Sequence, residues 1–303
     1  MQKMKLGLVY SGGLAKGAYQ VGFTKALTEY IRPQEISVVS GSSIGMTCAY
    51  SLSADKLDKL ESIWAQTDIR SGYSTVTNLM FGNLLNNKLD LLMDKDDKLL
   101  FPVYLNICYL PLRVQYIKLE GQYSDGWRKL MRAGLGFPVL TGFPTRFNNK
   151  FTLDGGAVDN IPLFPLLSDE QLDLIIVMHF DAYYNPQKEF QESVLRVLDF
   201  DLSINNRFVK ESYDLRKASI QKMLNSGYEY GKNVCKKLFA SGTSCADKIY
   251  KNGLEIMSQE KEFREHSPTV DVLFSALNKV GKLFRNDAKC VKKYDELVCP
   301  KEK

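Results

Sequence analysis

The chain has 303 residues, 45% of them apolar and 25% charged, which is enough to bury a substantial core in one large domain. The net charge is only +5, from 40 Lys and Arg against 35 Asp and Glu, so the composition does not call for a nucleic-acid partner. A mild attraction to anionic lipid surfaces is compatible with this charge.

The sequence contains no recognisable targeting or spanning segment. The apolar run Leu6–Tyr10 is too short for the hydrophobic region of a signal peptide, and the stretch 99–112 is interrupted by prolines and an asparagine. We therefore expect a cytoplasmic protein that at most contacts a membrane surface peripherally. Six cysteines without a C-x-x-C pair, and only two histidines, favour free thiols and no metal or other cofactor. A secreted protein with a disulfide-linked tail is the alternative.

A glycine cluster follows the first predicted strand. Leu6–Tyr10 has the pattern of a buried strand, Ser11–Gly17 that of a turn, and Ala18–Ile31 that of a helix ending before Pro33. Consecutive backbone N–H groups in such a turn, with a helix N-terminus behind them, favour an oxyanion site. A phosphate-binding loop and a plain turn are the alternatives, although the turn lacks the Gly-Lys-Ser/Thr of a Walker sequence.

Ser43 lies at the centre of a second turn between a predicted strand and a predicted helix. The strand is Ile36–Ser40, the turn is Gly41-Ser42-Ser43-Ile44-Gly45, and the helix covers Ile44–Leu52. The G-x-S-x-G spacing is typical of a nucleophile elbow, in which the glycines leave room for the backbones and the serine hydroxyl is exposed. By itself the pattern also fits a plain turn. In a parallel sheet the turns after neighbouring strands meet at the carboxyl edge, so the two glycine turns are expected to face each other.

The chain after the elbow is predicted to hold several helices and one pair of strands. The segment Ser71–Asp97 has the pattern of short amphipathic helices, which we interpret either as a lid over the serine or as helices facing the core. The other elements predicted here are a helix at Leu57–Ala65, paired strands at Phe101–Tyr109 and Val114–Lys118, and a helix at Trp127–Ala133 capped by Ser124 or Asp125.

Asp154 ends a short predicted strand, Phe151–Asp154, and precedes two glycines. An aspartate before glycines is common in surface turns. A serine nucleophile, however, needs a base, and histidine is scarce in this chain. A carboxylate within hydrogen-bond reach of Ser43 could accept its proton directly, provided that its surroundings shift its pKa toward the working range.

The order of these three motifs resembles that of the patatin-like phospholipase family. The resemblance covers residues 4–182 and rests on Gly12–Gln20, Gly41–Gly45, Asp154–Gly156 and the proline-containing approach Phe137–Pro144. It implies an α/β fold with a three-layer α/β/α core and a mainly parallel sheet. It also implies hydrolysis of lipid or phospholipid acyl esters, of the phospholipase A or lysophospholipase type, through a Ser–Asp dyad.

The resemblance assigns a role to each motif. Ser43 would be the nucleophile, Asp154 its partner, and the oxyanion hole would consist of the amides of Gly12, Gly13 and Leu14. The family often has a third glycine where Leu14 stands. Leucine keeps the N–H but restricts the backbone and adds bulk beside the acyl site. This departure keeps open the alternative of a non-catalytic lipid- or partner-binding protein on the same scaffold.

Two further side chains are candidates for the site. Lys16 follows the oxyanion turn, so we expect it either to bind a substrate phosphate or the developing charge, or to be a solvated surface lysine. His179 ends the apolar run 172–178, so the order Ser43, Asp154, His179 also fits the triad of an α/β-hydrolase esterase. In that fold, however, the oxyanion loop follows the third strand, whereas here the turn follows the first, which favours a structural His179.

After Pro186 the pattern changes to long helices without strands, so we divide the chain into a catalytic core, 1–185, and a helical C-terminal extension, 186–303, packed on it. The predicted helices are Glu189–Leu198, Val209–Tyr230, Ala246–Glu260 and Val270–Phe284. The basic stretch from Lys279 is interpreted either as an amphipathic helix at a membrane surface or as an ordinary packed helix.

Overall fold

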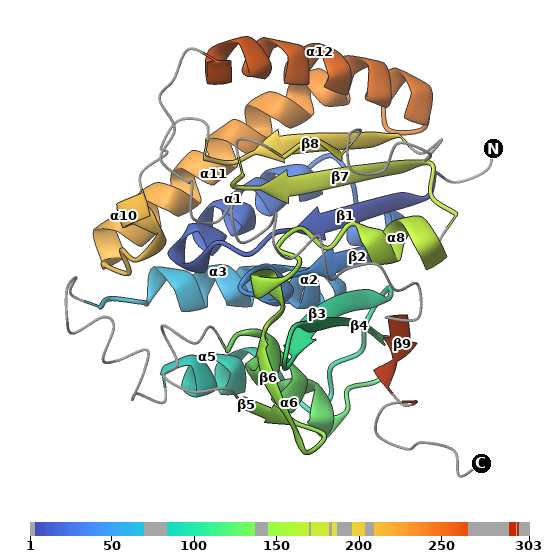
Figure 1. Cartoon of the computed structure of the whole chain (residues 1–303). Helices are drawn as coiled ribbons and strands as arrows, with labels where there is room; N and C mark the ends of the chain where they lie inside the picture. The colour runs from blue at the N-terminus through green and yellow to red at the C-terminus, as the bar shows by residue number, and fades with distance from the viewer. Residues whose placement is uncertain are drawn as a thin grey trace.

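The computed structural model describes residues 4–69, 84–136, 145–169, 171–181, 184–186, 196–203, 209–265, 291–294 and 296 (Figure 1). Several sequence predictions therefore lie outside the described residues. These are the approach 137–144, the first part of the 71–97 segment, residues 189–195 of the helix predicted at 189–198, the helix predicted at 270–284, residues 279–290 of the basic stretch, and Cys290 and Cys299. Cys48, Cys108, Cys235 and Cys245 are free thiols.

Four parallel strands form the middle and one edge of the sheet. They are β1 (Leu6–Tyr10), β2 (Ile36–Gly41), β7 (Leu174–His179) and β8 (Val197–Asp201), in the order β2-β1-β7-β8. Their side chains are almost all buried, because helices or loops cover both faces of the sheet. The predicted α/β fold with a mainly parallel sheet is confirmed.

The other part of the sheet is mixed and is organised around β3 (Val103–Tyr109). This strand runs parallel to β2 and antiparallel to β4 (Arg113–Leu119) and β6 (Lys150–Asp154). The predicted pairing of 101–109 with 114–118 is thus confirmed. Two three-residue strands complete this part, β5 (Thr145–Phe147) beside β6 and β9 (Val291–Lys293) beside β4. Residues 291–293 of the basic C-terminal stretch therefore form a strand, whereas both alternatives predicted from the sequence were helices.

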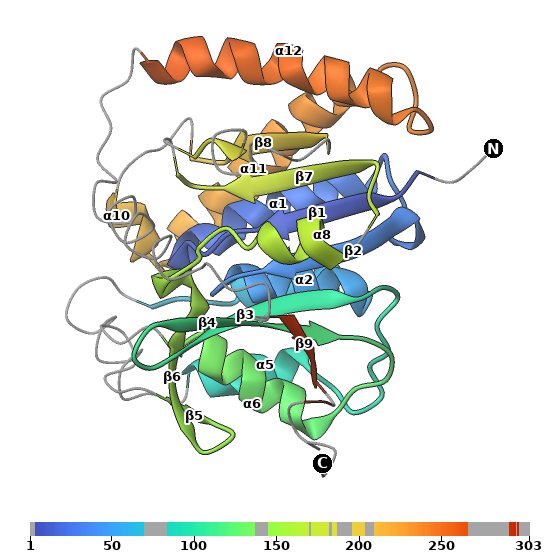
Figure 2. The same cartoon turned by 45° about the vertical axis from the view of Figure 1, so that its right-hand side comes forward.

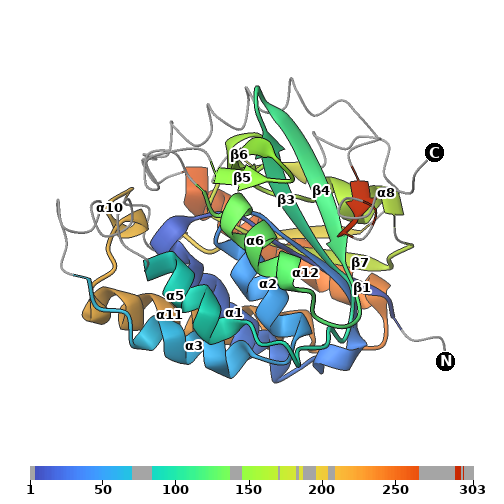
Figure 3. The same ribbon diagram turned by 90° about the horizontal axis from the view of Figure 1, so that it is seen from below.

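Helices cover the two faces of the sheet unequally. Figures 1 and 3 show α1, α2 and α3 together on one side of the sheet and the short α8 on the other. The bounds of the helices are η1 Leu14–Lys16, α1 Gly17–Thr28, η2 Pro33–Glu35, α2 Gly45–Ser53, α3 Leu57–Ala65, α5 Leu84–Leu92, α6 Asp125–Gly134, η3 Gly155–Ala157, α8 Phe164–Asp169, α10 Val209–Ser212, α11 Lys217–Leu238 and α12 Ala246–Glu265.

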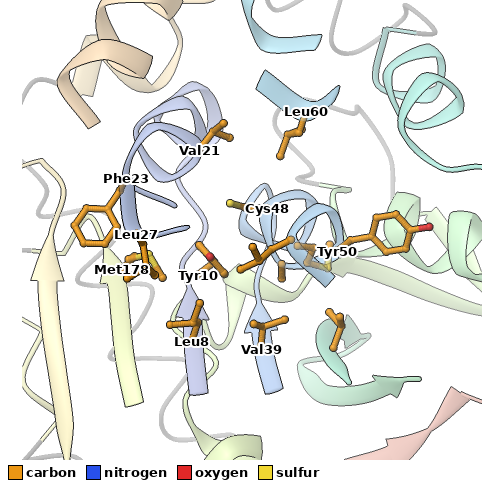
Figure 4. Packing of buried hydrophobic residues seen from close by; sticks show 14 of the residues in the cluster. Leu8, Tyr10, Val21, Phe23, Leu27, Val39, Cys48, Tyr50, Leu60 and Met178 are labelled. Atoms are coloured by element: carbon orange, nitrogen blue, oxygen red, sulfur yellow. The ribbon is translucent and has the colours of Figure 1, made fainter. Parts of the chain in front are cut away.

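The main core lies between the sheet and the layer of α1 and α2. Strand residues such as Leu8, Val39 and Met178 point into it and meet helix residues such as Phe23 and Leu27 (Figure 4). The neighbouring strand residues, which alternate with these, belong to a second cluster under α8; its members include Val9, Val38, Leu166 and Ile175. Because side chains alternate between the two faces of a strand, the same strands supply residues to both cores.

The region after residue 186 contains a strand, contrary to the sequence prediction. Val197 and Leu198 are the end of a predicted helix, but Val197–Asp201 forms β8 and pairs with β7. The predicted helix Val209–Tyr230 is also interrupted, since α10 ends at Ser212 and α11 begins at Lys217. In Figure 2, α12 lies across β8 and α11 lies behind the sheet with α1. The division at residue 185 therefore does not coincide with the edge of the sheet.

Candidate active site

Ser43 occupies a sharp turn between β2 and α2. Its φ of 51° lies in the left-handed region, which is unusual for a residue with a side chain. Both flanking glycines are required by close backbone contacts. A Cβ on Gly41 would lie 2.7 Å from the Gly45 carbonyl oxygen, and a Cβ on Gly45 would lie 2.6 Å from that of Ser11. The predicted strand–turn–helix at this motif is confirmed, and Ser43 directly precedes the N-terminal end of α2.

Asp154 reaches Ser43 because β2 and β6 share one edge of β3. The antiparallel partner β4 occupies the whole length of the other edge. On the shared edge, β2 ends where Gly41 pairs with Leu105, and β6 ends where Asp154 pairs with Ile107. The end of β2 and the end of β6 are thus only two β3 residues apart, although 111 residues separate Ser43 from Asp154 in sequence. The Ser43 Oγ donates a hydrogen bond of 2.6 Å to the Asp154 Oδ2.

The Asp154 carboxylate is buried, with 1% of its surface exposed, and both of its oxygens accept hydrogen bonds. The Oδ1 atom accepts one from the backbone N–H of Gly156 at 2.7 Å, and the Oδ2 atom accepts the one from Ser43. Burial raises the pKa of Asp154 to about 6, and these two hydrogen bonds only partly oppose the rise. At neutral pH the group is mainly ionised, yet it is a stronger base than an ordinary carboxylate.

The glycine turn lies against Ser43 but does not offer the three amides that were expected. A Cβ on Gly12 would lie 2.8 Å from the Cβ of Ser43, so the two backbones are in close contact. The N–H of Gly12, however, donates to the Asn160 carbonyl at 3.1 Å. Among the described residues, the N–H groups of Gly13 and Leu14 have no acceptor, and Leu14 has a φ of 54°. The predicted row of three donors is therefore reduced to two.

The sequence analysis missed two residues of the candidate active site, Asn160 and Ile44. Asn160 fixes Gly12 from both sides, because its Nδ2 also donates to the Gly12 carbonyl at 3.2 Å. The Ile44 amide, which directly follows the nucleophile, has no acceptor within the described part of the chain. The elbow motif could have indicated Ile44, since the residue after the serine often supplies an oxyanion donor. Nothing in the sequence around Asn160 indicates its contact with Gly12, which spans 148 residues.

Asp159 attaches the turn after Asp154 to the elbow and the sheet. Its backbone carbonyl accepts hydrogen bonds from Ser42 Oγ at 3.1 Å and from Asn106 Nδ2 at 2.6 Å. Its side chain accepts one from the Tyr116 hydroxyl at 2.5 Å. All four residues are buried, so these bonds are shielded from water and hold η3 in place behind the Ser43–Asp154 pair.

A cavity of about 150 Å³ opens beside Ser43. Its walls are mainly apolar, and its lining residues are Leu14, Ala15, Ser43, Ile44, Thr47, Leu60, Ile63, Trp64, Thr67, Lys88, Leu89, Leu92, Leu135, Ser212, Tyr213 and Leu215. They come from the glycine turn, α2, α3, α5, the end of α6, and the segment between α10 and α11. The described part of the segment 71–97 is residues 84–97, and the side chains of Leu89 and Leu92 on its helix α5 are buried in the main core and also line the cavity.

Lys16 and His179 lie apart from this cavity. Lys16 is buried rather than solvated, and its Nζ lies 5.8 Å from the centre of the Phe180 ring. His179 is fully buried at the end of β7. Its Nδ1 accepts from the Asp181 N–H at 3.2 Å, and its Nε2 lies 3.3 Å from the Asp199 Oδ2. The hydrogen-bond partner of the Ser43 hydroxyl is Asp154, and neither Lys16 nor His179 lines the cavity.

No family model and no curated protein matches this sequence. Among solved structures, VipD from Legionella pneumophila matches with a TM-score of 0.37 and 10% identity over 98% of this chain and 90% of that one. ExoU in its heterodimeric complex with SpcU, from the type III secretion system of Pseudomonas aeruginosa, matches with a TM-score of 0.34 and 15% identity. That match covers 86% of this chain and 59% of the other. Similarity at this level does not establish a family or an activity.

Neither a metal centre nor a membrane span is found in the described part of the chain. No three His, Cys, Asp or Glu side chains there come together as a metal site would require. None of the described helices combines the length and the apolar character needed to cross a bilayer.

Proposed function

We propose that the protein hydrolyses carboxylic esters of lipids through an acyl-enzyme formed on Ser43. The observation that supports this most directly is the 2.6 Å hydrogen bond from Ser43 Oγ to the buried carboxylate of Asp154. A serine hydroxyl at a strained elbow, in contact with a carboxylate of raised pKa, has the arrangement of a nucleophile and its general base. The proposal agrees with the resemblance of the three sequence motifs to patatin-like phospholipases.

In the proposed first half-reaction, Ser43 Oγ attacks the ester carbonyl as its proton passes to Asp154 Oδ2. The carbonyl oxygen becomes an oxyanion, which is stabilised by the N–H groups of Gly13 and Leu14, since no described residue accepts a hydrogen bond from them. When the tetrahedral intermediate collapses, the proton on Asp154 moves to the leaving alkoxide oxygen, and an alcohol departs. Ser43 is then acylated and Asp154 is ionised again.

In the second half-reaction, water attacks the acyl carbonyl and gives its proton to Asp154. The same amides stabilise the second oxyanion. Collapse of this intermediate releases the carboxylic acid, and the proton on Asp154 returns to Ser43 Oγ. All proton transfers use Asp154, and no cofactor takes part in the proposed cycle.

A lipid ester is the proposed substrate because the cavity next to Ser43 is mainly apolar. An acyl chain placed among side chains such as Leu60, Trp64 and Leu92 would be removed from water, which contributes about 25 cal/mol for each Å² of apolar surface buried. We also propose that the protein meets its substrate by peripheral contact with a membrane or micelle surface. A protein that binds a lipid without hydrolysing it is the second candidate, favoured by the bulk of Leu14 in the cavity wall.

A fluorophosphonate probe tests the nucleophile directly. We expect covalent labelling of the wild type at Ser43 and none of Ser43→Ala, because the probe phosphonylates an activated serine hydroxyl. Ser62→Ala is the matched control, since this serine is exposed on α3 and does not line the cavity. Labelling of Ser43→Ala at the wild-type level, or no labelling of either protein across a range of lipids and pH values, would favour the binding protein.

The pH dependence of turnover should follow the ionisation of Asp154. The group acts as a base only when ionised, and burial raises its pKa to about 6. We therefore expect kcat/KM for a soluble ester to rise about tenfold per pH unit well below pH 6 and to level off above it. A pH–rate profile checks this. A profile that is flat between pH 5 and 7 would contradict the assignment of Asp154 as base.

A further inference from the structure

Lys88 is a cation in the wall of an otherwise uncharged cavity. Of the described residues that line the cavity with Ser43, it is the only Lys, Arg, Asp or Glu. It lies on α5, the helix whose Leu89 and Leu92 are buried and also line the cavity. Since Lys88 is only partly buried, it stands where the wall of the cavity meets solvent.

Among the described residues, few interactions offset the free-energy cost of partly burying the Lys88 ammonium group. Its only hydrogen-bond acceptor in the described part of the chain is the Ile63 carbonyl oxygen at 3.4 Å, which is long for a hydrogen bond from a charged donor. No described carboxylate forms an ion pair with it. The acidic residues of this neighbourhood are already occupied, because Asp90 lies against Arg128 and Arg132 while Asp94 pairs with Lys56 and Lys59. Burial lowers the pKa of Lys88, and no neighbouring charge opposes this.

A partly desolvated cation without a counter-charge is unfavourable unless something pairs with it. We propose that Lys88 pairs with an anionic group on the lipid whose ester is bound at Ser43, so that the cavity selects anionic over neutral acyl esters. This inference rests on the proposed function and adds to it the charge of the substrate and the residue that recognises it. A phosphate on a lysophospholipid has the required chemistry, since it accepts short hydrogen bonds from an ammonium.

Lys88→Met tests the proposal, because methionine keeps the length of the side chain and removes its charge. The measured quantity is the ratio of kcat/KM for 1-oleoyl lysophosphatidic acid to that for 1-oleoyl glycerol in the same neutral detergent micelles. One charge-assisted hydrogen bond predicts a fall of about 10-fold to 100-fold in this ratio, mainly through KM of the anionic lipid. Lys88→Arg should restore most of it.

Lys95→Met is the matched control, because it removes the same charge from an exposed residue near the end of α5 that does not line the cavity. We expect its ratio to equal that of the wild type. An equal fall in Lys95→Met would assign the effect to general surface charge, and an unchanged ratio in Lys88→Met would overturn the proposal. Inhibition by inorganic phosphate without any preference between the two lipids would assign Lys88 to a free anion and also contradict it.

The assignment of Lys88 can be tested separately from the proposed hydrolysis. Ether analogues of the two lipids cannot be cleaved, and their binding can be measured by calorimetry. If neither ester is hydrolysed but the wild type binds the anionic ether lipid more tightly than Lys88→Met does, the hydrolase proposal fails and the assignment of Lys88 stands. If hydrolysis depends on Ser43 and the preference is independent of Lys88, the reverse holds.

Discussion

Replacing Asp154 by asparagine is expected to lower kcat for a lipid ester by about 10²-fold to 10⁴-fold, the range typical of losing a general base. Asparagine has nearly the same shape and can still accept the hydrogen bond from the Gly156 N–H. It cannot accept the proton of Ser43. Steady-state kinetics on the purified variant, with folding checked by circular dichroism, measures the effect. Retention of more than about a tenth of the wild-type kcat would contradict the proposed role of Asp154.

The same substitution should not destabilise the fold, which separates a catalytic effect from a structural one. Burial raises the pKa of Asp154 from 3.8 to about 6, which corresponds to roughly 3 kcal/mol against the ionised form in the folded protein. Because the folded state binds this proton more tightly than the unfolded state, the contribution of Asp154 to the free energy of unfolding decreases as the pH rises from about 4 to 6. We expect Asp154→Asn to lose this dependence and to unfold at a higher temperature at pH 7.

His179→Gln distinguishes the dyad from the rival triad. Glutamine can accept from the Asp181 N–H and reach Asp199, so it imitates the buried contacts of the imidazole. If Ser43 and Asp154 form a dyad, kcat per folded molecule should stay within about threefold of the wild type, since no proton transfer passes through His179. A loss as large as that of Asp154→Asn would favour the α/β-hydrolase triad.

Replacing Gly227 by alanine is expected to lower the free energy of unfolding by about 3 kcal/mol or more. In an exposed helix this change is normally stabilising by about 1 kcal/mol. Gly227 of α11, however, lies against α1, and a Cβ there would stand 2.2 Å from the carbonyl oxygen of Tyr19. The obstructing atom belongs to the backbone, so one of the two helices would have to move. Urea unfolding, followed by circular dichroism, gives the difference.

Glu229→Ala serves as the matched control, because this residue is two positions further along α11 and exposed. Its effect should be within about 0.5 kcal/mol. Gly22 of α1 makes the reciprocal contact, since a Cβ there would lie 2.1 Å from the Leu224 carbonyl oxygen. Gly22→Ala should therefore be destabilising to a similar degree. A Gly227→Ala protein as stable as the wild type would mean that the close approach of α1 and α11 is wrong.

The elements around the site could be predicted because their signals are local. The turn at Ser43 requires Gly41 and Gly45 within five residues, and the adjacent strand and helix have clear patterns. The position of Asp154 relative to Ser43 could be expected only from the order of the motifs, because the register of β2 and β6 on β3 is set by pairing across the sheet.

The features that escaped prediction depend on contacts between distant parts of the chain. The strand β8 has only five residues, Val-Leu-Asp-Phe-Asp, which are too few for their periodicity to distinguish a strand from part of a helix. The capture of the Gly12 amide by the Asn160 carbonyl has no sequence signal. The cavity wall contributed by Ser212, Tyr213 and Leu215 depends on the break between α10 and α11, which the continuous helical pattern concealed.

Because β2 and β6 share one edge of β3, the length of the connecting segments can change without moving Ser43 relative to Asp154. The spacing of the two reacting groups is set along one extended strand, at roughly 3.3 Å per residue, and not by the connections that lead to them. Insertions or deletions in the segments joining α3 to β3, or β4 to β6, should therefore leave that spacing intact. A one-residue slip of β6 along β3, by contrast, would turn Asp154 to the opposite face of the sheet and separate the pair.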